Sequence, residues 1–526
     1  MVQLRKWRPL LNLDADPGQA SYRRIVEGLI AAIREGRLQP GSLLPGTREM
    51  AQLLDVNRKT VILAYEEAIT QGWLVSEARR GTFVNTQLEA IAPCQGIARD
   101  FAPRLLTEPP VPYLQASRRD LALQRLPGAL FFDNGASDHR LLPQAVLHRY
   151  YRNALRSSFA ANTVRHGSDG SDDLLRTALA EMLRNNRGLS VSAENICLTQ
   201  GTQMSLYLAA SALIRPGDVV LVERLSYPPA WAVFRALGAR LVTVDIDSEG
   251  CQVDQIEALC QQHRVRMIYL TPHHQFPTTV SLRAERRQKL LMLARRHDFC
   301  VIEEDYDHEY HFEGRPYLPL ASDTGQRHVI YVGSLSKALG STFRCSFVVA
   351  PVNVIQVLEQ RSALVVSQGD AVMQTMLAAL INDGELKKHL RRVSKTYRQR
   401  REVLQDSLMK AFGERIAIRQ PQGGLALWVD FEAGTDVDRL VAQALEHKLV
   451  VRSGRQFSPL DLPENGLRLG FASLDTDEIR EAVQRLAQAS RHAVRQQQPG
   501  VKAAAESLRP VPGRWPAGPD VPGESA

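Results

Sequence analysis

The chain has 526 residues, of which 44% are hydrophobic and 23% charged, so it can form more than one domain and bury sizeable cores. A formal net charge of +8 is small for this length and permits contact with nucleic acid without requiring it. The six cysteines form no C-x-x-C pair, and no His cluster has zinc-site spacing, which argues against a structural metal and for a reducing compartment. No signal peptide or membrane-spanning apolar run is found, so we expect a cytoplasmic protein.

Residues 1–85 have the periodicity of short helices. The apolar stripe of a first helix, which ends near Gly36, consists of Tyr22, Val26, Leu29 and Ile33. Thr47 can cap a short second helix, and the turn at 55–57 leads into a third. Two short helices around a tight turn predict a helix-turn-helix.

Polar residues gather at the start of the third predicted helix, where helix-turn-helix motifs meet base edges in the major groove. They are Asn57, Arg58, Lys59 and Thr60. Arg58 is the best candidate for a bidentate contact to guanine. Residues 73–75 and 81–84 predict a hairpin whose tip, with Arg79, Arg80 and Gly81, suits a phosphate or minor-groove contact. Residues 1–85 carry 12 Lys/Arg and 9 Asp/Glu, so periodicity and charge are equally consistent with a three-helix protein-interaction module.

A resemblance decides between these readings. The motifs L-x-P-G-S-L-L-P-G-T-R, L-L-D-V-N-R-K-T-V and R-R-G-T-F-V, within residues 37–84, closely resemble the winged helix-turn-helix of GntR-family bacterial regulators. By that resemblance, the DNA contacts are made by Arg48, Arg58, Thr60 and Gly81. The family's usual L-P-S is L-P-G here, ending at Gly46.

The rest of the chain has a different composition. Residues 86–125 are rich in proline and predict a linker. Apolar runs typical of strands then alternate with helical patterns, which predicts a mainly parallel α/β domain at 126–385 and a smaller α+β subdomain at 386–492. The Pro/Gly/Ala-rich tail, 493–526, is expected to be disordered.

Within the α/β region, residues 329–347 place Lys337 on a turn of small residues after an apolar strand. A lysine in such a position can form an imine once it is deprotonated. Ser334 and Ser336 supply hydroxyls, and the guanidinium of Arg344 matches a phosphate in shape and charge. The segment alone is equally consistent with a surface lysine in a polar loop.

If Lys337 binds a cofactor, residues from other segments must contact the same cofactor. The turn Gly201-Thr202-Gln203 opens a helical pattern, whose N-terminus can hold a phosphate. Tyr227 follows a strand and can stack on a flat ring. In the run E-E-D-Y-D, strand alternation puts Glu304 and Tyr306 on one face and Asp305 on the other. A carboxylate in this run can keep the nitrogen of a pyridine ring protonated, and Glu304 is our first choice over Asp305 for that contact. The alternative interpretations of the acidic run are a helix cap and a metal site, and the metal site is disfavoured because no His/Asp spacing demands a metal.

Together with T-P-H-H-Q-F-P-T-T at 271–279, these segments strongly resemble fold-type I aminotransferases, which use pyridoxal 5'-phosphate. The resemblance implies that Lys337 forms the internal aldimine, that Tyr227 stacks on the ring and that Tyr306 meets the ring oxygen. Gln275 falls near the position of an asparagine on that oxygen, and Arg468 matches the arginine that grips an α-carboxylate. The phosphate is then held by Ser334, Ser336, Arg344 and the turn at Gly201, Thr202 and Gln203.

The order of the two domains resembles the MocR/GabR subfamily of transcriptional regulators. That resemblance implies a head-to-tail homodimer that senses pyridoxal phosphate or an amine, or amino-acid, effector. In the mechanism it suggests, the effector displaces Lys337 by transaldimination and the spacing of two operator half-sites changes. The alternative is an aminotransferase with turnover, and a cofactor-free scaffold is disfavoured because the site residues occur together.

Several positions depart from the aminotransferase pattern. Glu304 stands where relatives have aspartate, Thr279 where they have glycine, and His166 where many have a tyrosine that reaches the partner's phosphate. These departures weaken the expectation of transamination more than that of cofactor binding. Arg452 and Arg455 compete with Arg468 as the carboxylate anchor.

Overall fold

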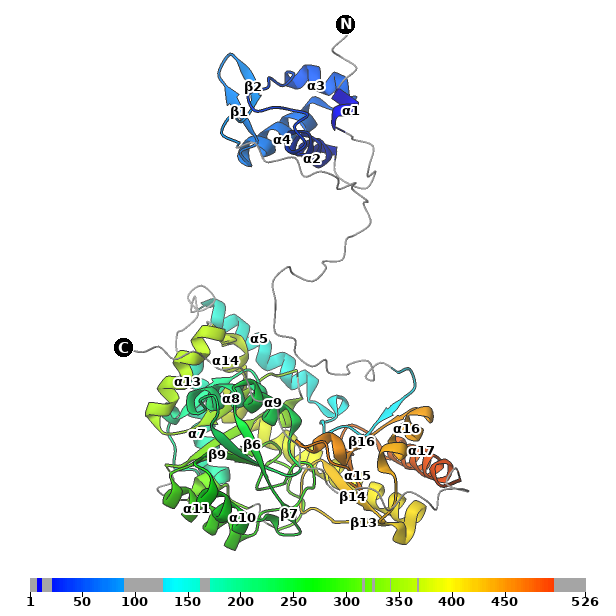
Figure 1. Cartoon of the computed structure of the whole chain (residues 1–526). Helices are drawn as coiled ribbons and strands as arrows, with labels where there is room; N and C mark the ends of the chain where they lie inside the picture. The colour runs from blue at the N-terminus through cyan, green and yellow to red at the C-terminus, as the bar shows by residue number, and fades with distance from the viewer. Residues whose placement is uncertain are drawn as a thin grey trace, which may run out of the picture. The chain divides into compact units, whose positions relative to one another are not determined.

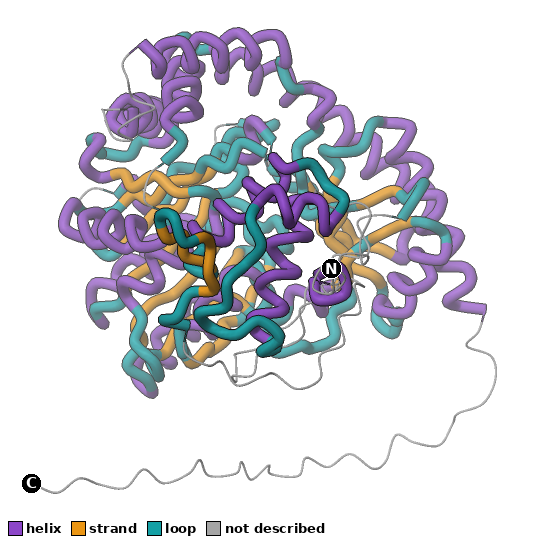
Figure 2. Tube along the Cα trace, turned by 90° about the horizontal axis from the view of Figure 1, so that it is seen from above, coloured by secondary structure: helices purple, strands orange, loops and turns teal. Residues whose placement is uncertain are grey.

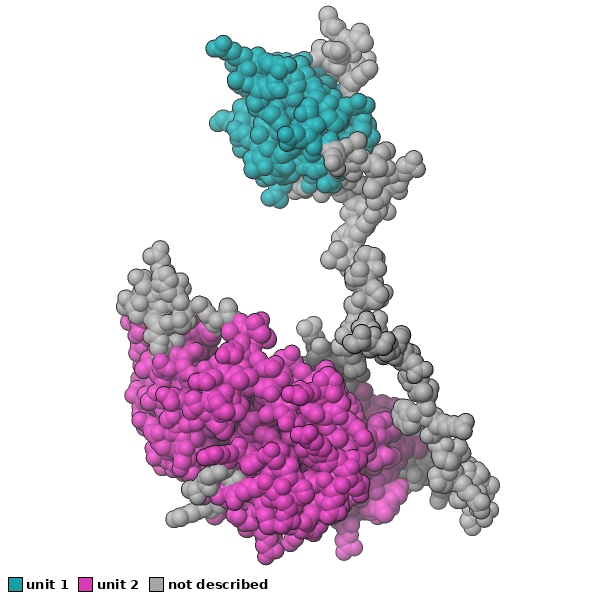
Figure 3. All heavy atoms as spheres, turned by 60° about the vertical axis from the view of Figure 1, so that its left-hand side comes forward, with its two compact units in different colours: residues 1–119 teal, residues 120–526 magenta. Residues whose placement is uncertain are grey.

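The structure is a computed structural model, in which the chain forms two compact units, Met1–Arg119 and Asp120–Ala526, coloured separately in Figure 3. It describes residues 7–11, 21–88, 126–160, 171–314, 317–323, 327–340, 342–366 and 369–495. Most of the predicted linker and tail therefore lies outside the described residues, as does His166. The last described helix continues to Arg495, slightly into the segment that was predicted to be disordered.

The N-terminal unit packs short helices and a hairpin around one core (Figure 1). The five-residue helix α1 was not predicted, because it is too short to show an apolar period. Gly46, not Thr47, is the N-cap of α3. The side chain of Asn57 caps α4, accepting a 2.9 Å hydrogen bond from the Lys59 backbone N–H. The elements are α1 (Trp7–Leu11), α2 (Ser21–Arg34), α3 (Thr47–Leu54), α4 (Arg58–Thr70), β1 (Leu74–Glu77) and β2 (Gly81–Val84).

The larger unit is built on a seven-stranded sheet. Only β12 runs antiparallel to its neighbours in this sheet, which confirms the predicted, mainly parallel α/β fold. In spatial order the strands are β4 (Ile196–Thr199), β12 (Ser346–Val349), β11 (Val329–Ser334), β10 (Cys300–Asp305), β9 (Val265–Leu270), β5 (Val219–Glu223) and β6 (Arg240–Val244).

Helices cover both faces of this sheet, because its strands are apolar on both sides. In β5, Val219 and Leu221 pack in the cluster that contains residues of α10 (Val253–Gln262) and α11 (Ala284–His297). Val220 and Val222 point to the opposite cluster, formed with α8 (Thr202–Leu213), α9 (Pro228–Ala236) and α13 (Val352–Val365). Figure 2 draws the helices in purple and the strands in orange.

A third cluster covers the end of the sheet at β4, β12 and β11. It is formed with α5 (Gln144–Ala160), α7 (Ser171–Arg187) and α14 (Ala371–Asn382). The short helix α12 (Ser336–Leu339) also packs in this cluster, whereas β7 (Ile246–Asp247) and β8 (Gly250–Cys251) form a separate two-stranded sheet.

The C-terminal part has its own core around a four-stranded antiparallel sheet. In spatial order its strands are β13 (Ile416–Ile418), β14 (Ala426–Phe431), β17 (Gly466–Gly470) and β16 (Arg452–Ser453). The helices that contribute to this core are α15 (Glu385–Phe412), α16 (Val437–Glu446) and α17 (Thr476–Arg495). In addition, β15 (Leu449–Val450) pairs with β3 (Leu130–Phe131), so the chain contacts this part before it enters the large sheet. The sequence did not predict that contact, because a two-residue strand has no recognisable alternation. None of the described helices is both long and apolar enough to cross a bilayer.

Candidate functional site

Lys337 lies at the carboxyl edge of the large sheet, in α12 and directly after β11. Its Nζ donates a 2.5 Å hydrogen bond to the carbonyl oxygen of Gly135, and the Tyr310 hydroxyl donates one of 2.6 Å to the Lys337 carbonyl oxygen. The surrounding protein excludes water and so lowers the pKa of Lys337, an effect that the nearby Asp133 carboxylate opposes. The lowered pKa favours the neutral amine, which is the form that attacks a carbonyl carbon.

A cavity of about 200 Å³ opens beside Lys337. It lies beyond the carboxyl ends of the parallel strands, where open α/β sheets bind their ligands. Tyr269, at the end of β9, could have been found from its place beside β10, and Thr271 and Phe276 lie in the motif at 271–279, although no role was predicted for them. Asn134 lies in a loop that carries no comparable pattern. The lining residues are Asn134, Thr202, Gln203, Tyr227, Tyr269, Thr271, Phe276, Glu304, Tyr306, Ser334, Ser336, Lys337 and Arg344.

Glu304 is the acidic group of the cavity. The Tyr269 hydroxyl donates a 2.5 Å hydrogen bond to its Oε2, and burial raises the pKa of Glu304 to about 7. Asp305 points to the other face of β10, where it accepts a 2.8 Å hydrogen bond from the Tyr331 hydroxyl. There His308 and the buried Arg187 hold the pKa of Asp305 well below its usual value, against the effect of burial. The structure therefore places Glu304, rather than Asp305, in the cavity.

Aromatic rings form one wall of the cavity. Phe276 packs edge-on against Tyr227, with ring centroids 5.2 Å apart, and against Tyr306 at 5.9 Å. The Tyr306 hydroxyl donates a 3.0 Å hydrogen bond to the carbonyl oxygen of His274, and burial raises the pKa of Tyr306. Tyr306 therefore stays protonated near neutral pH and can donate a hydrogen bond.

The hydroxyls of Ser334 and Ser336, the guanidinium of Arg344 and the N-terminus of α8 line another part of the cavity. Ser334 Oγ accepts hydrogen bonds from Ser336 N–H (3.1 Å) and the Ser346 hydroxyl (2.8 Å). Gly201, with φ +104°, lies under Arg344: a Cβ atom there would be 2.5 Å from the arginine Nη2. The bare Cα of Gly201 thus lets the guanidinium approach the helix N-terminus, and together they form a positive anion-binding end.

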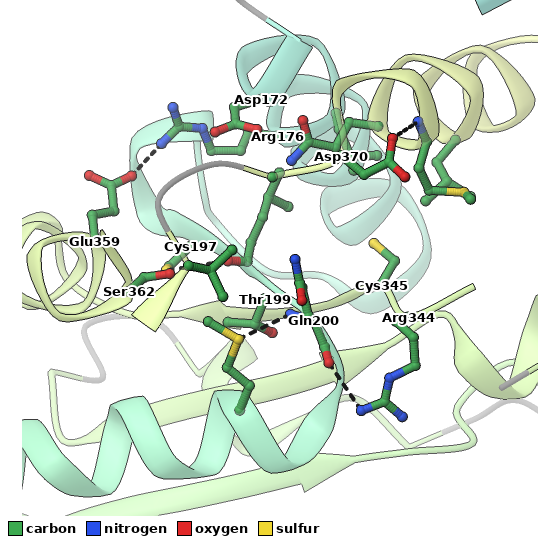
Figure 4. Close-up of a pocket in the computed structure, with 18 of the residues that line it drawn as sticks. Asp172, Arg176, Cys197, Thr199, Gln200, Arg344, Cys345, Glu359, Ser362 and Asp370 are labelled. Atoms are coloured by element: carbon green, nitrogen blue, oxygen red, sulfur yellow. Dashed lines mark hydrogen bonds and ion pairs between the residues drawn. The ribbon is translucent and has the colours of Figure 1, made fainter. Parts of the chain in front are cut away.

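A second cavity, of about 590 Å³, begins on the other side of Arg344 (Figure 4). Arg344 donates a 3.1 Å hydrogen bond to the carbonyl oxygen of Gln200 at one end of this cavity. At the other end, Arg176 pairs with Glu359 at 2.5 Å. Arg344 therefore lines both cavities.

Three predicted residues lie outside the lining of the smaller cavity: Gly201, described above, Gln275 and Arg468. The Gln275 amide N–H groups donate to Glu223 Oε2 (3.1 Å) and to backbone carbonyls, and its Oε1 accepts from Thr278. The structure therefore does not place Gln275 on a ring oxygen, because both ends of its amide are already bonded, to Glu223 and Leu225 at and just past the end of β5 and to residues of its own loop. Arg468, 1% exposed, lies behind Tyr306: its Nη2 is 3.4 Å from the Tyr306 hydroxyl, and its Nε has no hydrogen-bond partner among the described residues.

The competing arginines point elsewhere. Arg455 is paired with Asp461 at 2.9 Å and with Asp438 at 3.5 Å. Arg452 is exposed, although it pairs with Arg468 in the register of β16 and β17. Of the three candidate carboxylate anchors, Arg468 is thus the one that contacts a residue of the cavity wall, Tyr306.

In the N-terminal unit, the predicted DNA contacts are exposed at the starts of two helices and on the hairpin. Arg58 begins α4, and its Nε donates a 3.4 Å hydrogen bond to Thr47 Oγ1 at the start of α3. Arg48 and Lys59 are exposed, and Thr60 is partly exposed. Gly81, with φ +120°, follows the tip of the hairpin.

The comparisons with known proteins match both units. The profile of the aminotransferase class I and II family matches residues 136–486, and that of the gntR family of bacterial regulatory proteins matches residues 21–84. The chain is 30% identical to the HTH-type transcriptional regulator TauR of Rhodobacter capsulatus over 91% of this chain and 98% of that protein. It is 29% identical to the probable rhizopine catabolism regulatory protein MocR of Rhizobium meliloti, over 91% and 95%.

Solved structures resemble the larger unit. The α-aminoadipate aminotransferase LysN of Thermus thermophilus, solved with N-(5'-phosphopyridoxyl)-L-leucine, is 28% identical with a TM-score of 0.65, over 70% of this chain and 94% of that one. The multiple substrate aminotransferase of Thermococcus profundus is 25% identical with a TM-score of 0.67, over 71% and 94%. The likeness to the regulators extends through both units, and the chain therefore belongs to the MocR-type regulators of the GntR family, in which a helix-turn-helix domain precedes a class I and II aminotransferase domain.

Proposed function

We propose that this protein is a transcriptional regulator that binds pyridoxal 5'-phosphate in the 200 Å³ cavity and responds to an amine or amino-acid effector. The observation that carries the proposal is the cavity itself: a lysine of lowered pKa, a buried carboxyl group and an anion-binding end face the same space. A regulator that binds operator DNA acts in the cytoplasm.

The residues of the cavity fit this cofactor. Arg344 and the hydroxyls at the N-terminus of α8 suit its phosphate, and Glu304 suits its ring nitrogen. Tyr306 can donate to its ring oxygen once its hydroxyl turns away from the His274 carbonyl oxygen, and Tyr227 can pack on the ring. The buried Oδ1 of Asn134 has no hydrogen-bond partner among the described residues, so the cavity also offers an acceptor that a ligand can use.

When bound, the cofactor supplies an aldehyde carbon for which Lys337 and a free primary amine compete. Burial lowers the pKa of Lys337 and so favours the neutral amine that this exchange requires. Arg468 supports an amino acid as effector, because its buried Nε is free of partners within the described residues and can hold a carboxylate. We expect Arg468→Met to weaken the response to amino acids more than the response to amines without a carboxylate.

Turnover as an aminotransferase is the second candidate, since Lys337 and Glu304 face the same cavity as they would in an enzyme. Turnover requires a proton to be moved between carbon atoms and a keto acid to be released, whereas sensing requires only reversible exchange. The N-terminal helix-turn-helix favours sensing.

We also infer a head-to-tail homodimer, as the family resemblance implies. Leu364 and Val365, at the end of α13, are 88% and 63% exposed and offer an apolar surface for a second copy. Sedimentation of the purified protein at several concentrations tests this inference; a monomer throughout would contradict it.

The test of the sensor follows the visible absorption of the bound cofactor and the binding of upstream DNA in one titration with amines and amino acids. We expect one effector to change both signals in the wild-type protein, and neither to respond in Lys337→Ala. Keto-acid release without any change in DNA binding would support the enzyme instead. If Lys337→Ala kept both the absorption band and the effector response, the proposal would be wrong.

The DNA contact is tested with Arg58→Ala. Loss of a bidentate contact to guanine costs about 1–3 kcal/mol, so we expect DNA affinity to fall by roughly 5- to 150-fold. Arg23→Ala, which removes an exposed arginine from α2, is the charge-matched control. An equal loss in both variants would mean that Arg58 contributes only general charge.

A further inference from the structure

Four histidines gather at the carboxyl edge of the large sheet, outside the lining of the cofactor cavity. His273 and His274 follow β9, and His308 and His311 follow β10, so the pairing of these two parallel strands brings them together. The ring centroid of His273 is 4.3 Å from that of His274, 5.1 Å from that of His308 and 6.0 Å from that of His311. The first three side chains are buried, and His311 is partly buried.

Hydrogen bonding leaves several of these ring nitrogens unused. Both nitrogens of His273 and both of His311 are shielded from solvent and have no hydrogen-bond partner among the described residues. His273 is only 5% exposed. Buried polar atoms are nearly always satisfied, so unpartnered nitrogens on neighbouring rings indicate a missing partner.

The nitrogens are also arranged as a metal site requires. His273, His274 and His311 each offer one ring nitrogen, and these three atoms lie within 4.8 Å of one another. Tetrahedral bonds of 2.0–2.1 Å place such nitrogens roughly 3.4 Å apart, which small side-chain rotations can achieve.

A carboxylate orients one of the three rings. His274 Nδ1 is 2.7 Å from Asp307 Oδ1, and both side chains are buried. When Nδ1 donates its proton to Asp307, the lone pair of Nε2 is left for a metal ion, which is the usual arrangement of a histidine ligand and its supporting carboxylate.

We propose that His273, His274 and His311 bind a divalent transition-metal ion of the zinc type. Three neutral imidazoles suit Zn²⁺, Co²⁺ or Ni²⁺, whereas Mg²⁺ and Ca²⁺ prefer oxygen ligands. Three protein ligands leave a fourth position for water or for the neighbouring His308. The sequence analysis, which expected no metal, did not predict this cluster, because His311 lies 37 positions after His274 and only the pairing of β9 with β10 brings them together.

The ion would join two parts of the larger unit. His311 forms a backbone bridge with Gly423, in the loop between β13 and β14, and Gly424 N–H donates a 2.7 Å hydrogen bond to the Tyr310 carbonyl oxygen. Binding at the three histidines would therefore hold the edge of the large sheet against the C-terminal sheet. This role does not depend on the cofactor or on DNA.

The test measures metal content in the full-length protein without a histidine tag. The protein is stripped with EDTA, exposed to excess Zn²⁺, passed through metal-free gel filtration and analysed by mass spectrometry of the elements. We expect one zinc ion per chain in the wild type, and loss of that ion in His273→Ser and in His311→Gln. His148→Ser, which changes an exposed histidine of α5, should keep it.

Two further readouts separate this proposal from loss of fold and from the sensor. Circular dichroism shows whether each variant is folded, and thermal unfolding with and without Zn²⁺ should show a stabilising shift only in proteins that retain the ion. A wild-type protein that retains no zinc after gel filtration would overturn the proposal, and so would folded His273→Ser/His311→Gln protein that retains as much as the wild type. Neither result depends on cofactor absorption or DNA binding.

Discussion

Gly201→Ala tests whether Arg344 can take its place at the anion-binding end of the cavity only because Gly201 has no Cβ atom. Gly201 has φ +104°, a conformation that other residues adopt at a cost of about 1–3 kcal/mol. A Cβ atom there would also be 2.5 Å from Nη2 and 2.8 Å from Cζ of Arg344, so the guanidinium has to move. The variant should therefore lose stability and, separately, affinity for the cofactor phosphate.

Gly217→Ala supplies the matched control. Gly217 has φ +89°, but no atom lies within 4 Å of its would-be Cβ. It should lose a similar amount of stability and keep its cofactor affinity. A hydrogen bond to a charged group contributes about 1.5–3 kcal/mol, so displacement of Arg344 should weaken cofactor binding roughly 10- to 150-fold in Gly201→Ala alone.

The assay is a titration of cofactor-free protein with pyridoxal 5'-phosphate, followed by absorption, beside thermal unfolding of the same samples. If Gly201→Ala bound the cofactor as tightly as Gly217→Ala did, the bare Cα of Gly201 would not be needed to seat Arg344. The assignment of this end of the cavity to the phosphate would then fail.

Two further predictions concern buried charges next to the site. Burial raises the pKa of Glu304 from 4.5 to about 7. Between these pH values the folded protein keeps the carboxyl proton, whereas the unfolded chain has lost it, so the free energy of unfolding decreases as the pH rises from about 4.5 to 7. Glu304→Gln, whose amide oxygen can still accept a hydrogen bond from the Tyr269 hydroxyl, should not show that fall. Above pH 7 it should be more stable than the cofactor-free wild type by about 3 kcal/mol. If urea unfolding gave the same difference in stability between the two proteins at pH 5 and at pH 8, the prediction would be wrong. Arg187→Met should destabilise by about 3–5 kcal/mol in urea unfolding, because it leaves the buried carboxylate of Asp305 and the partly buried one of Glu309 without their guanidinium. A loss under about 1 kcal/mol would show that His308 alone compensates Asp305.

The sequence predicted most of the fold because local patterns dominate it. The apolar runs of β5, β9, β10 and β11 and the helical periods between them are visible in single windows, and strand alternation placed Glu304 in the cavity correctly. Elements shorter than their own period were missed: α1 has five residues, and β3 has two.

The parts of the site that could not be predicted depend on contacts between distant residues. Asn134 reaches the cavity from a loop before the large sheet, and nothing near it in sequence marks that approach. Gln275 was assigned by likeness to an asparagine, but its longer side chain is held by Glu223 and backbone carbonyls. The convergence of His273 with His311 likewise appears only when β9 and β10 are paired.

Successive residues of strand β10 point to opposite faces of the sheet and so lie in different environments. Ile302 and Glu304 face the side of the cofactor cavity, whereas Val301 and Asp305 face the opposite side, where Arg187 lies. A deletion or insertion of one residue between 300 and 303 would exchange these faces, placing Asp305 against the cavity and Glu304 against the guanidinium. Evolution can therefore exchange amino acids along this strand much more readily than it can change the strand's length.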